Sequence, residues 1–325
     1  GWLKNVAAAN TDLVFGVAFR PYLVNGLFDE EAVAIERGKL RQQLQAEVND
    51  KRLYCVRQAR RRFFGDSLAG VERDGYLEEV DGVTPQLLTR VYEEMLCKAS
   101  IEVTAIGAKD ETVRRLLLAA LEGRKREWQA PLPGLFMPRQ QPDHQVETMD
   151  MVQAKLCLLF TAGRCTGAQE IAASRLAMAL YGGSVTSRLF LNVREKQSLC
   201  YYCSSSYTSV TGCMMVDSGV EPANAQKAEA AILKELAQLC DGPITDEEME
   251  DCRRGLLSSL ESVEDSLSGL EGWYFAEIAR GGPVSTPAQA RAALEQVTKE
   301  QVRQVLRQFT LSVSYLLTPE VNDHA

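Results

Sequence analysis

Apolar residues recur along this chain with two different spacings, and these spacings predict a mixture of helices and strands. A period of three to four residues indicates amphipathic helices, whereas strict alternation over a short run indicates strands. Helices are expected near residues 29–64, 84–97, 110–122, 167–181, 222–240, 246–265, 287–295 and 298–308. Strands are expected near residues 12–20, 101–107, 151–161, 200–208, 211–220 and 310–317. Because adjacent hairpin-like strands at 200–220 occur among helices, the pattern favours an α+β fold over a doubly wound parallel sheet.

A proline-rich stretch between residues 124 and 148 interrupts this pattern and indicates a linker. It holds four prolines, at positions 131, 133, 138 and 142. The chain has 325 residues, which is enough for two domains of common size. We therefore expect a first α+β domain over residues 1–123, a linker over 124–147 and a second α+β domain over 148–325.

The two predicted domains contain similar segments, which indicates a two-fold repeat. A shift of 217 residues superimposes six identical residues at two helix starts. They are Asp29, Glu30, Glu31, Arg37, Gly38 and Leu40 on Asp246, Glu247, Glu248, Arg254, Gly255 and Leu257. Each half also ends in an alternating segment, residues 101–106 in the first and 311–316 in the second. Two similar halves are expected, each with a mostly antiparallel sheet packed against helices.

The repeat also indicates that the first half is incomplete. From about residue 148, the second half runs roughly 98 residues to Asp246, whereas only 28 residues precede Asp29. The comparison predicts that about 70 residues are absent at the N-terminus of the first domain.

Charge, hydropathy and cysteine usage exclude several classes of protein. The net charge of −8 and the pI of about 5.1 argue against a nucleic-acid partner, which a basic chain would suit better. No apolar run reaches the ~18 residues of a membrane span, so no membrane association is expected. The nine scattered cysteines suit reduced thiols in a cytoplasmic protein. Cys200 and Cys203 have CxxC spacing, but strand alternation predicts that they point in different directions.

One segment carries candidate chemistry. After Gly182 and Gly183, a helix-like run leads to Arg194, and a predicted strand begins with Tyr201 seven residues later. A guanidinium and a phenol at this spacing can reach one cavity and polarise a carbonyl by hydrogen bonds. The spacing by itself leaves open a plainer interpretation, a solvated helix end followed by a half-buried tyrosine.

The longer pattern around these residues resembles the pitrilysin/insulinase superfamily, the inverted zincins that include mitochondrial processing peptidase. The motif is Gly-Gly-x-x-x-Ser-Arg-Leu-Phe-x-x-Val-Arg-Glu-Lys-x-x-Leu-x-Tyr at 182–201, and the repeat supports it. The resemblance implies a clamshell of two similar halves. One half carries H-x-x-E-H with the glutamate as general base, and the other carries the Arg/Tyr pair that grips the substrate carbonyl. In many bacterial members the two roles lie on separate, paired polypeptides.

The chain departs from the family pattern where zinc ligands are expected. There is no H-x-x-E-H, and the only histidines are His144 and His324. The third ligand of the family corresponds to position 43, which is Gln43 here, a degenerate metal-ligand position because a neutral amide is a poor zinc ligand. Glu47, one helical turn further, is the alternative ligand. We expect no cofactor in this chain, with zinc either on a partner or in the missing N-terminal segment.

The resemblance therefore leads to three hypotheses about function. In the first, the chain is the non-catalytic subunit of a two-chain zinc endopeptidase. Arg194 and Tyr201 would bind the peptide substrate and assist catalysis beside a zinc-bearing homologous subunit or a second copy of the chain. In the second, the chain is an active zinc metallopeptidase whose H-x-x-E-H lies in the missing segment. In the third, it is an inert scaffold that binds a partner enzyme.

Overall fold

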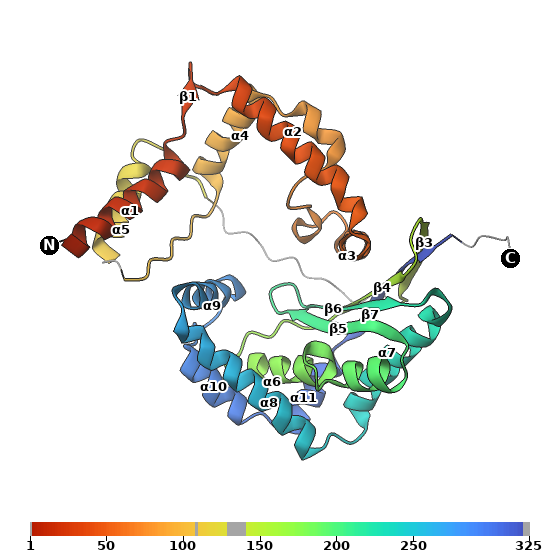
Figure 1. Cartoon of the computed structure of the whole chain (residues 1–325). Coiled ribbons are helices and arrows are strands. Elements are labelled where there is room, and N and C mark those ends of the chain that lie inside the picture. Colours follow the sequence, from red (N-terminus) through yellow and green to blue (C-terminus); the bar gives the residue numbers. More distant parts are fainter. Residues whose placement is uncertain (1, 108–109, 129–140, 321–325) are drawn as a thin grey trace. The chain divides into compact units, whose positions relative to one another are not determined.

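The computed structural model describes residues 2–107, 110–128 and 141–320, and the contacts within it divide the chain into two compact units (Figure 1). The first unit comprises residues 1–46 and 72–132, and the second comprises residues 47–71 and 133–325. Sheet and helices occur together, as the predicted α+β class requires. The segment 47–71 belongs to the second unit, whereas the sequence places it in the first domain.

In its described residues the first unit consists of helices and one short hairpin. Its elements are α1 (Trp2–Phe19), β1 (Leu23–Val24), β2 (Leu27–Phe28), α2 (Glu30–Ala46), η3 (Leu77–Gly82), α4 (Pro85–Lys98) and α5 (Asp110–Ala120). A small apolar core of Phe15, Phe19, Leu96 and Val113 joins α1, α4 and α5. The rings of Phe15 and Phe19 meet edge to face with centroids 5.6 Å apart.

Two strands predicted in this unit do not form. Residues 12–20 lie almost entirely in α1, because Phe15 and Phe19 are one helical turn apart and pack on the same core. Residues 101–106 adopt no regular structure. A strand needs a hydrogen-bonded neighbour, and the strands described in this unit are the two-residue pair β1 and β2.

The second unit is built on a five-stranded sheet in the order β3-β7-β4-β6-β5. Its strands are β3 (Asp143–Met149), β4 (Ala154–Thr161), β5 (Cys200–Thr208), β6 (Cys213–Val220) and β7 (Thr310–Pro319). β3 runs parallel to β7, and the other pairs are antiparallel. β3 includes residues 143–147, which the sequence assigns to the linker. Both β3 and β5 are edge strands, and β5 carries Tyr201.

Helices cover one face of this sheet (Figure 1). They are α6 (Ala168–Met178), α7 (Ala225–Asp241), α8 (Asp246–Glu261), α10 (Pro287–Glu295) and α11 (Lys299–Leu306), with α9 (Leu267–Arg280) beside them. The alternation of β4 explains the layer, since Leu156, Leu158 and Phe160 all point into the helical core. α9 lies outside the helices that the sequence predicts.

The opposite face of the sheet is covered by α3 (Lys51–Phe64), which packs Cys55, Ala59 and Phe63 against β4 and β7. One helix over 29–64 is therefore wrong: α2 ends at Ala46 and a new helix begins after Asp50. The Asp50 side chain accepts hydrogen bonds from the backbone N–H groups of Arg52 and Leu53, which caps α3. The break allows α3 to pack on the sheet of the second unit.

In both units an arginine side chain on one helix donates to a backbone carbonyl just before the start of another helix. In the first unit, Arg37 of α2 donates to the carbonyl of Val83 at 3.0 Å, and the next residue, Thr84, caps α4. In the second, Arg253 of α8 donates to the carbonyl of Val297 at 2.8 Å, and Thr298 caps α11. The arginine thus fixes the chain just before a helix start in both units, although the predicted repeat pairs Arg37 with Arg254 rather than with its neighbour Arg253.

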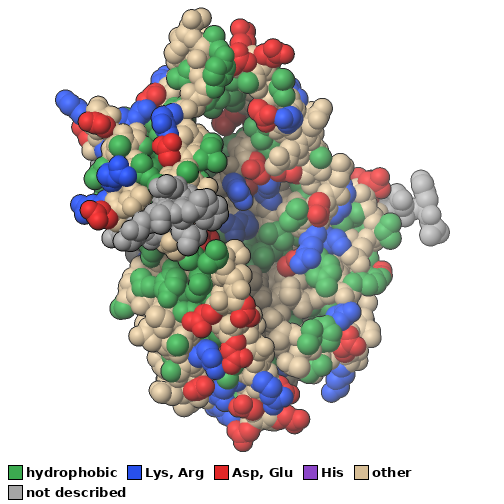
Figure 2. Space-filling view, turned by 60° about the vertical axis from the view of Figure 1, so that its left-hand side comes forward, with side chains coloured by type: hydrophobic (Ala, Val, Ile, Leu, Met, Phe, Trp, Pro, Cys, Tyr) green, Lys and Arg blue, Asp and Glu red, His purple; other side chains and the backbone are tan. Residues whose placement is uncertain are grey.

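The surface carries side chains of both charges, as the composition predicts. Acidic and basic side chains are interspersed over the face drawn in Figure 2. Within the described ranges, no helix is both long enough and apolar enough to cross a membrane.

Candidate functional site

Arg194 and Tyr201 line one cavity of about 360 Å³ in the second unit. Arg194 lies on η5 (Leu189–Lys196), a π-helical segment, and Tyr201 lies at the start of β5. The rest of the wall comes from Arg52, Gly182–Val185, Phe190 and Tyr202–Ser204. The cavity therefore follows the outer edge of the sheet, where an extended ligand has access to the edge strand.

The Arg194 side chain is held from two sides. Its Nε donates to the backbone carbonyl of Tyr201 at 2.8 Å, and its guanidinium lies over the ring of Phe190, 4.7 Å from the centroid. Nη1 is 3.1 Å from a carboxylate oxygen of Glu195. Because Nε is engaged by the backbone and Nη1 by Glu195, the guanidinium plane is oriented, and Nη2 carries the donors that a ligand can use.

A β-bulge places Tyr201 outside the ladder. Cys200 pairs with Val220 and Tyr202 pairs with Gly219, so Tyr201 has no residue opposite it. The bulge turns the phenol outward, with 52% of the residue exposed. Its hydroxyl donates to a carboxylate oxygen of Glu221. The phenol can donate to a ligand carbonyl only after it leaves this carboxylate, since it has a single proton.

The same bulge overturns the prediction for the two cysteines. Cys200 and Cys203 are both buried in the helical core, where the two thiols interact electrostatically. The extra residue shifts the alternation by one, so positions that should diverge face the same side. The interaction with Cys203 lowers the pKa of the Cys200 thiol.

Gly182 and Gly183 bring the chain close to the edge strand. They end η4 (Ala179–Gly183), and a Cβ on Gly182 would lie 2.8 Å from the backbone N of Ser205 and 2.7 Å from Leu189. No side chain fits there without displacing backbone. Gly182 is therefore required by the contact between η4 and β5, and Gly183 by its close approach to the carbonyl of Met178, 3.0 Å from its Cβ position.

Arg52 is the cavity residue that the sequence analysis missed. It comes from α3, lies over the ring of Tyr202 at 4.5 Å and donates from Nε to Asp217. Asp217 is 4% exposed and also accepts from the Tyr202 hydroxyl at 3.3 Å. Burial raises the pKa of Asp217, and the hydrogen bond from Arg52 opposes that shift. The predicted helix over 29–64 covers α3, but Arg52 and Asp217 are 165 residues apart, so no spacing in the sequence indicated their contact.

The residues that the structure describes do not fit a zinc ion. Gln43 is exposed on α2, and its amide donates to Asp74 at 3.4 Å. Glu47 forms an ion pair with Arg57, and His144 lies on β3 with Nδ1 3.8 Å from Glu229. His324 lies outside the described residues. Among those described, no three His, Cys, Asp or Glu side chains cluster as metal ligands would.

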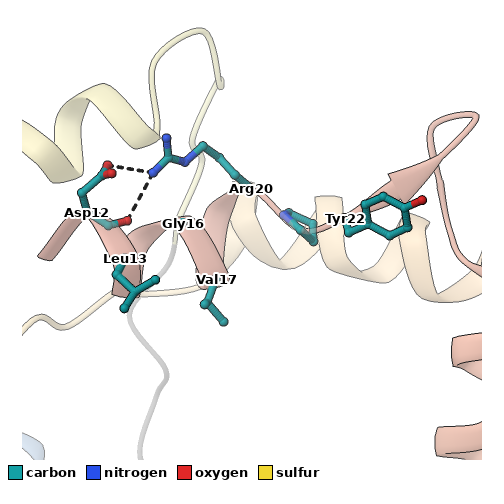
Figure 3. A pocket seen from close by; sticks show the side chains of 7 residues that line it. Asp12, Leu13, Gly16, Val17, Arg20 and Tyr22 are labelled. Carbon is teal, nitrogen blue, oxygen red and sulfur yellow. Dashed lines mark hydrogen bonds and ion pairs between the residues drawn. The ribbon is translucent and has the colours of Figure 1, made fainter. Parts of the chain in front are cut away.

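A larger cavity, of about 470 Å³, lies along α1 in the first unit but holds little chemistry (Figure 3). Arg20 folds back along the helix and pairs with Asp12 at 2.7 Å, while Leu13 and Val17 point to another side. Both charged side chains are 59% exposed, so the pair is a weak surface contact. The cavity with Arg194 and Tyr201 is therefore the candidate site.

Comparisons with known proteins bear on the family of the chain. The family model described as "Peptidase M16 inactive domain" matches residues 82–256, more than half of the chain. "Probable inactive metalloprotease YmfF" of Bacillus subtilis is 25% identical over 307 residues, which cover 94% of this chain and 72% of that protein.

Two solved structures share the fold. One is a conserved protein from Enterococcus faecalis V583, with a TM-score of 0.86, 24% identity and coverage of 98% of this chain and 75% of that one. The other is a peptidase M16 inactive domain from Pseudomonas fluorescens, with a TM-score of 0.73, 16% identity and coverage of 92% and 73%.

Gly182→Ala should lower the free energy of unfolding by about 1–3 kcal/mol, because the new methyl group must displace the backbone of Ser205. Gly255→Ala is the matched control. It lies inside α8 with nothing within 4 Å of its Cβ position, and should raise stability by about 0.5–1 kcal/mol. Urea unfolding followed by circular dichroism measures both. Equal effects of the two substitutions would contradict the close contact.

Asp217→Asn should change how stability depends on pH. The raised pKa means that the folded chain holds the Asp217 proton more tightly than the unfolded chain, whose pKa is near 3.8. Asp217 therefore contributes fully to the free energy of unfolding below pH 3.8. This contribution falls as the pH rises through the raised pKa of Asp217 in the folded chain.

Asparagine removes this titration. Over that window the free energy of unfolding of Asp217→Asn should increase relative to the original chain, as measured by urea unfolding at a series of pH values. A relative stability that stays flat or decreases with rising pH would show that the ion pair with Arg52 outweighs burial.

Proposed function

Because the chain belongs to the peptidase M16 family, we propose that it is an inactive, peptide-binding member that works beside a zinc-bearing homologous subunit. The family membership confirms the resemblance to the pitrilysin/insulinase superfamily. The observation that carries the proposal is the meeting of Arg194 and Tyr201 in one cavity at the edge of the sheet. A carbonyl of an extended peptide is the ligand that this arrangement suits.

Arg194 supplies the fixed part of the proposed clamp. Its Nε is anchored on the Tyr201 carbonyl, so the Nη2 donors face the cavity in a set orientation without a further loss of side-chain freedom. Arg52 and Asp217 neutralise one another at the cavity wall. The net charge at the wall is therefore low, which suits a neutral carbonyl whose oxygen gains negative charge during peptide cleavage.

Tyr201 supplies the movable part. Its hydroxyl donates to Glu221, and both residues are exposed, so water or a ligand can compete for the contact. In the proposed mixed complex the phenol turns from Glu221 to the carbonyl oxygen as the peptide binds. The partner supplies the zinc ion and the general base, since the described residues of this chain do not fit the metal.

The absence of a zinc cluster among the described residues leaves the inert scaffold as the competing function. One observation favours the scaffold: both side chains of the clamp already have partners. Tyr201 donates to Glu221, and Arg194 contacts Glu195 and the backbone carbonyl of Tyr201. A scaffold would bind the partner and leave the partner's activity unchanged. The cytoplasm, where nine free thiols stay reduced, is the proposed location for either function.

Arg194→Ala and Tyr201→Phe should each lower kcat of the mixed complex by about 10²–10³, the usual cost of losing one donor to a developing oxyanion. Steady-state hydrolysis of a fluorogenic peptide by the purified complex measures this. Arg254→Ala, on the exposed face of α8, is the control and should leave kcat unchanged. Full activity of both site variants, in complexes that still assemble, would establish the scaffold instead.

Glu221→Gln should raise kcat/KM of the mixed complex about fivefold. A neutral amide holds the Tyr201 hydroxyl less strongly than a carboxylate by about 1 kcal/mol, so the phenol is released more readily to the substrate. The same peptide assay reports the change. If Glu221→Gln lowers activity as Tyr201→Phe does, the carboxylate positions the phenol rather than competing for it.

A further inference from the structure

A second cavity in the same unit has a different chemical character. It measures about 260 Å³ and lies between α6, α9 and the turn that follows β5. Its charged wall consists of Arg175 from α6 and Arg280 at the end of α9, and its polar lining includes Ser209 from the turn, Ser174 and Tyr207. Neither Arg194 nor Tyr201 lines it.

Arg280 and Glu277 form a buried ion pair at the base of this cavity. Their side chains are 10% and 3% exposed, and Arg280 Nη1 donates to Glu277 Oε1 at 2.5 Å. The second oxygen of Glu277 accepts from the backbone N–H of Ser285 at 3.1 Å. Arg280 Nε donates to the Ser209 hydroxyl oxygen at 3.0 Å. Glu277 is thus already neutralised and largely saturated with donors.

Arg175 is the second cation of this cavity, and Glu277, which already pairs with Arg280, does not neutralise it fully. Its Nη2 is 3.7 Å from Glu277 Oε1, too far for a hydrogen bond, and its guanidinium stacks on the ring of Trp273 at 4.6 Å. Its side chain is 26% exposed, so its donors reach the cavity. No hydrogen bond from Arg175 is recorded within the described part of the chain. Burial, and then the charge of Arg280, lower the pKa of its guanidinium.

A third guanidinium adds to the positive field. Arg164 Nη2 donates to the backbone carbonyl of Arg280 at 3.1 Å, and its buried Nε has no partner. Arg175 and Arg280 therefore share the carboxylate of Glu277, and the guanidinium of Arg164 lies against the backbone of Arg280, in a chain whose net charge is −8. A buried cation without a counter-charge is costly, and proteins normally supply that charge from a side chain or a ligand.

We propose that this cavity binds a small oxyanion, a carboxylate or phosphate group, between Arg175, Arg280 and Ser209. The planar fork of Arg175 presents two parallel N–H groups, the geometry that matches two oxygens of such an anion. The Ser209 hydroxyl accepts from Arg280 and therefore has its own proton to donate to the ligand. The anion supplies the negative charge that the surrounding side chains lack. This site is independent of the proposed peptide clamp.

The test is thermal unfolding of the 325-residue chain in sodium phosphate, sodium acetate or sodium chloride at equal ionic strength and pH. Phosphate or acetate should raise Tm in a saturable way, and chloride should not, because binding to the folded state stabilises it by mass action. A shift with phosphate alone assigns the site to phosphate groups, and a shift with acetate alone assigns it to carboxylates. No saturable shift with either anion would overturn the proposal.

Arg175→Gln should weaken the affinity derived from this shift at least about tenfold, the usual effect of losing a charged hydrogen-bond donor. Without added anion the variant should stay close to the original chain in stability, because removal of a partly buried cation offsets the loss of its stacking on Trp273 and of its long ion pair with Glu277. Arg254→Gln, on the surface of α8, is the matched control and should keep the full shift. An equal shift in Arg175→Gln would overturn the site, and Ser209→Ala serves the same comparison if Arg175→Gln does not fold.

Discussion

The contact between Gly182 and the backbone of Ser205 is the constraint on which the candidate site depends. Without side chains at Gly182 and Gly183, η4 can lie directly against edge strand β5. The segment that follows, η5, then starts at a fixed place and carries Arg194 to the beginning of the same strand. Backbone packing, rather than a contact between the two functional side chains, thus determines where the guanidinium lies.

The bulge at Tyr201 completes the arrangement. It separates this residue from the ladder, so its side chain can turn outward while its carbonyl accepts from Arg194 Nε. The same irregularity brings Cys200 and Cys203 together in the core. One extra residue in the strand therefore has an effect on each side of the sheet edge: an accessible phenol outside and a buried pair of thiols inside.

The two arginine-lined cavities of this unit differ in how their charge is balanced. At the peptide site, Arg52 is paired with Asp217 and the wall is close to neutral, which suits a polar but uncharged carbonyl. At the second cavity, Arg175 and Arg280 share only Glu277, so positive charge remains. A buried charge without a partner is costly. The nearly neutral wall of the peptide site therefore favours a dipolar ligand, and the positive wall of the second cavity favours an anion. Gly183 lines both cavities, so the two sites lie on either side of the same backbone segment.

The sequence by itself determined the α+β class, the strands β4, β5, β6 and β7, and the motif that brings Arg194 and Tyr201 to one cavity. These rest on local periodicity and on a long patterned segment, which do not depend on distant neighbours. The tertiary structure decided the rest. Residues 101–106 alternate like a strand, yet form none, because a strand exists only with a hydrogen-bonded neighbour. Arg52 and Arg175 gained their roles from contacts across 165 and about 100 residues of chain, with Asp217 and with Glu277 and Arg280. Burial and charge balance are properties of the folded surroundings, and no spacing along the chain encodes them.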